Sequence, residues 1–224
     1  MAARFPAPRA VLFDLDGTLV DSAPDLAEAA NAMRCARGLP DLPLATLRPM
    51  ASHGARGLVG TAFGVAKDDA AFPALRDEFL DNYERARFPR TDLFDGVAAM
   101  LAALEAAGLR WGIVTNKVAR FTEPLVARLG LAQRAGAVVC GDTTPHAKPH
   151  PAPLLHAARA LGLDPTACLY VGDDLRDIQA GRAAAMGTIA AAWGYCADTT
   201  PASWQADVVI AHPRELAGLL GLAH

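Results

Sequence analysis

From about residue 95 to the carboxyl end, the sequence alternates between helical stretches and short apolar runs that are typical of buried β-strands. The strands we expect from this pattern span residues 109–114, 137–140, 168–171, 187–191 and 208–210, and the helices between them span 97–107, 120–129, 151–161 and 174–185. Regular alternation of this kind predicts a parallel sheet with helices on both faces. A further apolar run at 11–13 adds one strand to the same sheet. The predicted fold class is therefore α/β, with a Rossmann-like parallel sheet core.

Residues 20–90 follow a different pattern, because their apolar positions recur at helical spacing and are interrupted by glycine and proline. One expected helix follows Ser22 and ends near Gly38, and others span 43–50, 54–63 and 69–87. We expect no strand in this stretch before Phe88. The sequence therefore predicts two parts, a core made of residues 1–19 and 91–224 and an inserted helical cap domain made of residues 20–90.

Composition excludes several classes of protein. With 224 residues and 52% hydrophobic content, the chain has enough apolar side chains for a full core, and a net charge of −3 argues against nucleic-acid binding. Its four cysteines are far apart in the sequence, so they form no short pair of the kind that binds zinc or exchanges disulfides. The first residues resemble neither a signal peptide nor a membrane span. We therefore expect a cytoplasmic protein that acts on a small molecule and binds neither nucleic acid nor membrane.

Polar side chains follow each strand that is expected near the centre of the sheet. They are Asp14 and Asp16 after 11–13, Thr115, Asn116 and Lys117 after 109–114, Lys148 in the loop after 137–140, and Asp173, Asp174 and Asp177 after 168–171. A solvated loop explains any one of these clusters by itself. Because parallel strands end at one edge of the sheet, where such folds bind their ligands, the four clusters together predict a functional site.

The residue types of these clusters indicate metal-assisted phosphoryl transfer. Carboxylates that converge in one crevice repel one another and need a divalent cation, and oxygen ligands suit Mg²⁺. Asp14 is placed to act as a nucleophile, and Asp16 to donate a proton to the leaving oxygen and later to take one from water. A threonine hydroxyl, backbone amides and one lysine then hold the phosphate oxygens. Only three of the 21 basic residues are lysines, Lys67, Lys117 and Lys148, so a lysine near a strand end indicates a need for a compact charge.

Four short motifs occur in order along nearly the whole chain: DLDGT at 14–18, VTN at 114–116, KPHP at 148–151 and GDDLRD at 172–177. Together they resemble the four motifs of haloacid dehalogenase (HAD) superfamily phosphatases, over residues 11–224. The helical insertion after the first motif is similar to the small cap of the phosphoglycolate phosphatase branch. The stretches SHGARGLV, WGIVTNK and GYCADTTPASWQADVVIAHP are in turn similar to a subgroup that includes N-acetylmuramic acid 6-phosphate phosphatase.

The resemblance implies a catalytic or phosphate-binding role for five residues. Asp14 matches the nucleophile and Asp16 matches the general acid and base. Thr115, Asn116 and Lys148 match the residues that hold the phosphate.

The resemblance also implies a magnesium site. Asp14, Asp16 and Asp173 match the metal ligands, with Asp16 contributing its backbone carbonyl. Asp177 resembles a carboxylate that lies behind these ligands and orients them. Asp174 has two interpretations, contact with the metal through water or capping of the following helix.

The implied activity is Mg²⁺-dependent hydrolysis of a small phosphomonoester through an aspartyl-phosphate intermediate. The first expected substrate is 2-phosphoglycolate, and N-acetylmuramic acid 6-phosphate is the alternative. Because the core recognises only the phosphoryl group, specificity is expected from the cap, where His53 and Arg56 are the candidate substrate-binding residues. A solvated helix start explains the same two residues without a functional role.

Other functions share parts of this pattern. A phosphomutase of the same fold uses every core residue named above, and nothing in the cap sequence excludes it. A non-enzymatic phospho-aspartate switch also combines an aspartate, Mg²⁺, a threonine and a lysine, but an inserted cap favours turnover. A dehalogenase does not need Asp16 or Asp173, and a phosphonate hydrolase needs a cap lysine, for which only Lys67 in a polar context is available.

Overall fold

A computed structural model of the chain describes residue 5 and residues 8–196 and 199–222. Short parts of the predicted core, at both ends of the chain, and residues 197–198 of the GYCADTT stretch lie outside the described residues. Within the described part of the chain, no helix is both long and apolar enough to cross a membrane.

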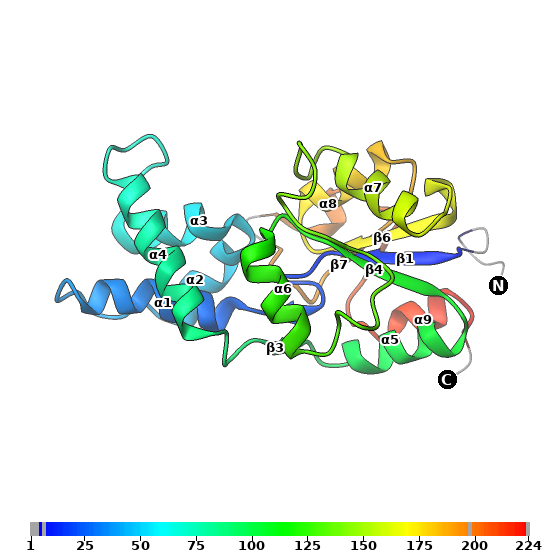
Figure 1. Cartoon of the computed structure of the whole chain (residues 1–224), viewed down its shortest axis with the longest axis horizontal. Helices are drawn as coiled ribbons and strands as arrows, with labels where there is room; N and C mark the ends of the chain where they lie inside the picture. The colour runs from blue at the N-terminus through cyan, green and yellow to red at the C-terminus, as the bar shows by residue number, and fades with distance from the viewer. Residues whose placement is uncertain (1–4, 6–7, 197–198, 223–224) are drawn as a thin grey trace.

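The main sheet has six strands, all parallel, in the order β5-β4-β1-β6-β7-β8 (Figure 1). The strands are β1 (Ala10–Phe13), β4 (Arg110–Val114), β5 (Val138–Val139), β6 (Cys168–Gly172), β7 (Gly187–Ala191) and β8 (Val208–Ile210). Each lies within one residue of its predicted bounds. The predicted α/β class with a Rossmann-like parallel sheet is therefore confirmed.

Helices cover both faces of this sheet. They are α5 (Val97–Ala106), α6 (Ala119–Arg128), α7 (Ala152–Ala160), α8 (Leu175–Ala183) and α9 (Glu215–Leu219). In Figure 1, α7 and α8 lie on one face, and α5 and α9 lie on the other. Along β1, Val11 and Phe13 pack in the same apolar cluster as Leu101 of α5, whereas Leu12 packs in a second cluster with Leu154 of α7. Because alternate side chains of a strand point to opposite faces, β1 is buried on both sides.

The stretch predicted as the cap forms helices α1 (Ala23–Cys35), α2 (Leu44–Leu47), η1 (Arg48–His53), α3 (Gly54–Phe63) and α4 (Phe72–Ala86). Figure 1 shows these helices grouped beyond the carboxyl end of β1. We refer to them together as the insertion. Among these helices, the most extensive packing is that of α1 against α4 and of α3 against η1.

A second, two-stranded antiparallel sheet joins the insertion to the core. It pairs β2 (Val20–Asp21) with β3 (Asp92–Leu93). The prediction that no strand precedes Phe88 in this stretch is wrong at β2. A two-residue strand is too short to show an alternating pattern, and β2 forms only because the distant strand β3 pairs with it. The division into a core of 1–19 and 91–224 and a cap of 20–90 stays a prediction, and the pairing of its two junctions supports it.

Candidate active site

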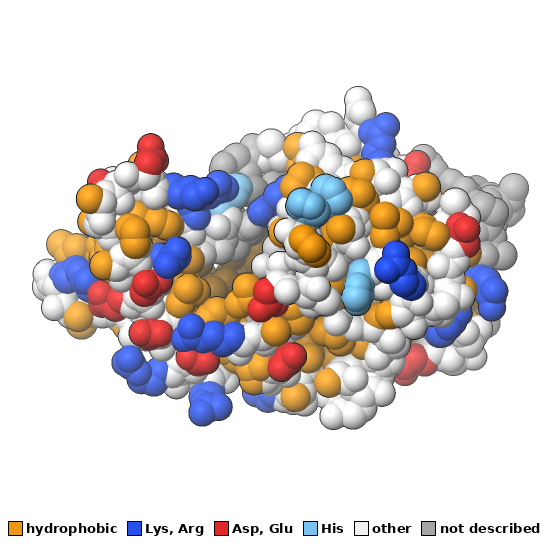
Figure 2. Space-filling model, turned by 45° about the horizontal axis from the view of Figure 1, so that its top comes forward, with side chains coloured by type: hydrophobic (Ala, Val, Ile, Leu, Met, Phe, Trp, Pro, Cys, Tyr) orange, Lys and Arg blue, Asp and Glu red, His pale blue; other side chains and the backbone are white. Residues whose placement is uncertain are grey.

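The carboxyl ends of the three central strands lie level with one another. Phe13, the last residue of β1, pairs with Ile113 of β4 and with Val171 of β6. A cavity of about 310 Å³ lies between these strand ends and the insertion, and Figure 2 shows the surface hollowed between the two parts. Its lining includes all the core residues predicted for the site: Asp14, Asp16, Thr115, Asn116, Lys148, Asp173, Asp174 and Asp177. The four polar clusters of the sequence therefore share one cavity.

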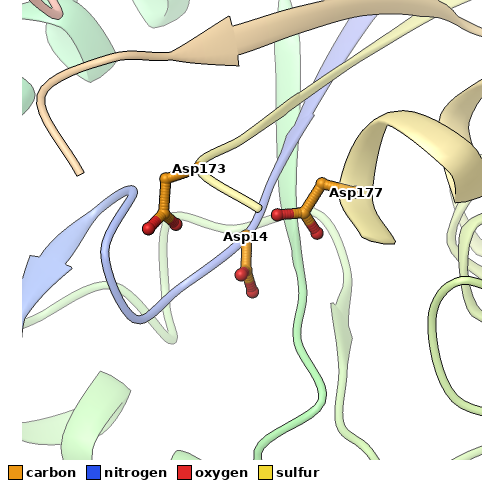
Figure 3. Close-up of side chains that lie close together, drawn as sticks. All are labelled: Asp14, Asp173 and Asp177. Carbon is orange, nitrogen blue, oxygen red and sulfur yellow. The ribbon is translucent and has the colours of Figure 1, made fainter. Parts of the chain in front are cut away.

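Three carboxylates meet at the floor of this cavity. Oxygen atoms of Asp14, Asp173 and Asp177 lie within 4.8 Å of one another (Figure 3). Burial raises the pKa of Asp14 to about 7, with Asp177 adding to the rise and Lys148 opposing it. Burial, together with the charges of Asp14 and Asp177, also raises the pKa of Asp173 well above its ordinary value. The protein alone therefore disfavours full ionisation of this cluster.

The donor set of the cluster fits a hard divalent cation, because it consists of oxygen atoms whose negative charges a cation would offset. The cluster holds the predicted ligands Asp14 and Asp173 and adds Asp177, whereas the ligand predicted from Asp16 is its backbone carbonyl, which stays a prediction. Both oxygens of Asp177 already accept hydrogen bonds, from Lys148 and Tyr170 on one side and from the Asp174 N–H on the other. Asp14 and Asp173 are therefore the carboxylates best placed to hold a metal.

Asp173 is fixed by donors from two distant segments. The Thr18 hydroxyl donates to Oδ1 and the Tyr195 N–H donates to Oδ2, each at 2.9 Å. Gly17 lies against this carboxylate with a φ of 87°, and a Cβ there would come within 2.1 Å of Oδ2. Only glycine meets both demands, so the glycine of DLDGT serves the turn and the close approach together.

Lys148 is the buried cation of the site. Its Nζ lies 2.9 Å from Asp14 Oδ1 and 2.7 Å from Asp177 Oδ1, and it donates to the Tyr170 hydroxyl and the Val114 carbonyl at 2.8 and 3.0 Å. Burial acts to lower the pKa of Lys148, but the two carboxylates outweigh it and raise that pKa above its ordinary value. Lys148 therefore remains charged beside Asp14.

Thr115 and Asn116 follow β4 on the same edge. Thr115 is buried, lines the cavity and accepts a hydrogen bond from the Lys117 N–H. The Asn116 side chain accepts from the Lys148 N–H at 2.9 Å and donates to the Lys148 carbonyl at 3.0 Å. Asn116 thus holds the backbone of Lys148 in place, while its predicted contact with phosphate stays a prediction.

Asp16 is held away from the other carboxylates by a cation that sequence analysis assigned no role. Lys117 Nζ lies 3.0 and 3.1 Å from the two Asp16 oxygens and 2.9 Å from the hydroxyl of Tyr83 on α4. The Ser22 hydroxyl also donates to Asp16. Because lysine is scarce in this chain, the sequence could have indicated a role for Lys117 in the site. Nothing in the sequence indicated Tyr83, because its place in the site depends on how the insertion packs.

Asp174 caps helix α8. Its side chain accepts from the Arg176 N–H, and Asp177 reciprocates by accepting from the Asp174 N–H, which completes a capping box. Of the two interpretations of Asp174, the structure shows the helix cap. The Arg176 guanidinium pairs with both Asp174 oxygens at 2.8 Å and donates to the Ser52 carbonyl of the insertion at 2.5 Å. Arg176 therefore ties the core to the insertion at the cavity wall.

The two predicted cap residues have different positions. His53, at the end of η1, lines the cavity, but Arg56 is exposed and is absent from the lining. The insertion contributes a mainly apolar wall, with Leu26 from α1 and Phe79 and Leu80 from α4. The insertion therefore presents no arginine or lysine to the cavity in the described part of the chain.

Comparisons with known proteins place this arrangement among hydrolases. Residues 8–185 match the haloacid dehalogenase-like hydrolase family. N-acetylmuramic acid 6-phosphate phosphatase of Pseudomonas aeruginosa is 48% identical over 216 residues, covering 96% of each chain. Phosphoglycolate phosphatase of Xanthomonas campestris pv. campestris is 52% identical over 210 residues, covering 93% of this chain and 95% of that one. A crystal structure described as a predicted phosphoglycolate phosphatase from Haemophilus somnus matches with a TM-score of 0.83 and 26% identity, over 98% and 99% of the two chains.

Proposed function

Because this chain belongs to the haloacid dehalogenase-like hydrolase family, we propose that it is a Mg²⁺-dependent phosphatase that cleaves a small phosphomonoester. The observation that carries the proposal is the position of Asp14, which lies at the floor of the cavity with the Lys148 ammonium 2.9 Å from its Oδ1. A nucleophile beside a buried cation suits attack on a phosphoryl group, since the cation stabilises charge on the transferred oxygens.

Asp14 acts as the nucleophile through Oδ2. Its Oδ1 is held by the Leu15 N–H at 2.7 Å and by Lys148, whereas Oδ2 has no hydrogen bond among the described residues. Attack by Oδ2 on phosphorus forms the aspartyl-phosphate and breaks the bond to the substrate oxygen, which takes a proton from Asp16. A water molecule then gives a proton to Asp16 and attacks the phosphorus, which releases phosphate and restores Asp14.

Asp14 and Asp173 are the residues that would hold Mg²⁺, together with the backbone carbonyl of Asp16. When bound, Mg²⁺ supplies positive charge to the phosphoryl oxygens and lowers the repulsion between the carboxylates. Asp177 stays behind them and orients Lys148, with which it pairs at 2.7 Å. Thr115 directly follows β4 and lines the cavity, and its hydroxyl would donate to an oxygen of the transferred group.

We propose 2-phosphoglycolate as the substrate, in keeping with the 52% identity to a phosphoglycolate phosphatase. A second candidate, N-acetylmuramic acid 6-phosphate, is favoured by the cavity itself. Its volume of about 310 Å³ and its apolar wall suit a molecule larger than a two-carbon acid. The 48% identity to an N-acetylmuramic acid 6-phosphate phosphatase supports this candidate.

The test is phosphate release from 2-phosphoglycolate, N-acetylmuramic acid 6-phosphate and common sugar phosphates, with kcat/KM compared between substrates. We expect EDTA to abolish release from the preferred substrate and added Mg²⁺ to restore it, because the carboxylate cluster needs a cation. Release that persists in EDTA would show that the metal is not required. Conversion of a sugar phosphate to an isomer would identify a mutase, and stable phosphorylation without release would identify a switch.

Replacing Lys117 tests whether Asp16 needs its partner to act as the acid. Lys117→Met removes the cation that holds both Asp16 oxygens, so we expect kcat for phenyl phosphate to fall roughly 10- to 100-fold. The rate with p-nitrophenyl phosphate should fall much less, because p-nitrophenolate leaves without a proton. Lys67→Met, at an exposed lysine of the insertion, is the matched control. Equal losses on the two esters would contradict this role.

The predicted cytoplasmic location stays a prediction, and cell fractionation tests it.

A further inference from the structure

The site must recognise the part of its substrate that lies beyond the phosphoryl group, and the described lining of the cavity offers three lysine or arginine side chains for that purpose. Two are committed to the reaction, since Lys148 lies 2.9 Å from Asp14 and Lys117 lies 3.0 Å from Asp16. The third is Arg176. We propose that Arg176 determines specificity by binding a second anionic group of the substrate, a carboxylate. This proposal rests on the phosphatase activity proposed above.

Arg176 is held in a fixed orientation, which a specificity residue needs. Its Nε and Nη2 bond the two oxygens of Asp174, which itself is fixed as the cap of α8. The second N–H of Nη2 reaches the Ser52 carbonyl on the insertion. Contacts on both sides of the cavity therefore fix the plane of the guanidinium, so little conformational entropy is lost when it binds a ligand.

One nitrogen of Arg176 remains available to a ligand. Nη1 has no hydrogen-bond partner among the described residues, and the side chain lines the cavity while about a third of its surface, 34%, is exposed. An arginine side chain does not lose its charge, so Nη1 offers two charge-assisted donors under all conditions of interest. A substrate carboxylate is the acceptor that matches them best.

Arg176 lines the same cavity of about 310 Å³ as Asp14 and Lys148. Its partner Asp174 directly follows Asp173, whose carboxylate lies in one cluster with that of Asp14. One molecule bound in this cavity can therefore contact both Arg176 and the reaction centre. Among the described residues, the insertion adds His53 to the lining but no lysine or arginine, since Arg56 is exposed and lies outside it.

The experiment compares substrates that differ in the carboxylate. N-acetylmuramic acid 6-phosphate and N-acetylglucosamine 6-phosphate differ by a lactyl group that carries it, and 2-phosphoglycolate and ethyl phosphate form a smaller pair. We expect Arg176→Gln to lower kcat/KM for the carboxylate-bearing member of the productive pair roughly 10- to 100-fold, the range for a hydrogen bond to a charged group. The neutral member should be little affected. Arg182→Gln, on the last turn of α8 and outside the cavity, is the matched control.

Equal losses on both members, or no loss on either, would overturn the role of Arg176. Arg176→Lys is a second variant in case the glutamine weakens α8, and it should retain part of the preference because it keeps the charge. Thermal melting of each variant reports its fold.

A further measurement separates this proposal from the phosphatase activity. Binding of both members of a pair is measured by calorimetry in the Asp14→Asn background, with and without Arg176→Gln. If the unaltered enzyme releases no phosphate from any substrate, the proposed activity fails, whereas the binding comparison still decides the role of Arg176. Unchanged affinity for the carboxylate-bearing member would overturn that role.

Discussion

Asp14→Asn is expected to slow phosphate release by at least about 10⁴-fold on every substrate that the enzyme accepts. The amide oxygen is a poor nucleophile, and the amide cannot form the aspartyl-phosphate. Its size is nearly that of the carboxyl group, so the cavity keeps its shape. The measurement is phosphate release under single-turnover conditions, followed by acid quench and treatment with hydroxylamine, which releases phosphate from an acyl phosphate. Only the unaltered enzyme should yield that labile fraction.

The same variant should keep its fold. The Asp14 side chain is mostly shielded from solvent, with 14% of its surface exposed, and its pKa is raised to about 7, so its ionisation at neutral pH costs stability that the amide does not lose. The loss of the Lys148 ion pair acts in the opposite direction, and we expect the free energy of unfolding to change by about 1 kcal/mol or less. Asp68→Asn, at an exposed aspartate of the insertion, is the control. Near-normal release by Asp14→Asn would contradict the nucleophile assignment.

The sheet could be predicted from the sequence because its strands are short apolar runs, and the central strands β1 and β6 are buried throughout. Each of these runs is set off by polar or glycine residues, so its bounds are visible in the sequence. The two-residue strand β2 and the short helix α9 had no such signal. Val20 joins a strand only because Leu93, 73 positions later by residue number, pairs with it. Structure that depends on a distant partner leaves little local pattern.

The residues of the site also differ in whether the local sequence could predict them. Asp14 and Thr115 could be predicted because each follows a strand directly, and the parallel sheet aligns the strand ends. Contacts across the cavity could not be predicted, since Tyr83 reaches Lys117 only after α4 packs against the core. For Arg56 the predicted substrate contact stays a prediction. Its residue type and position favoured a substrate contact, but its place on α3 leaves it in solvent.

Lys148→Met is expected to reduce both activity and stability, because one ammonium group holds several buried acceptors. Its removal leaves the Asp14 and Asp177 carboxylates facing each other, and it leaves the Val114 carbonyl without that donor. Breaking a buried ion pair from one side costs about 3 kcal/mol or more, since the remaining charge is uncompensated. We expect the free energy of unfolding to fall by about that amount and kcat to fall by at least about 100-fold, because the phosphoryl oxygens lose a cation.

A double-variant cycle separates the electrostatic cause from a general packing defect. In the Lys148→Met background, Asp177→Asn removes one of the two facing carboxylates and should recover part of the lost stability, whereas it destabilises the protein when Lys148 is present. Lys67→Met makes the same substitution at an exposed lysine and should leave unfolding by urea unchanged. If Asp177→Asn lowers stability equally in both backgrounds, the cost of losing Lys148 comes from packing rather than from charge.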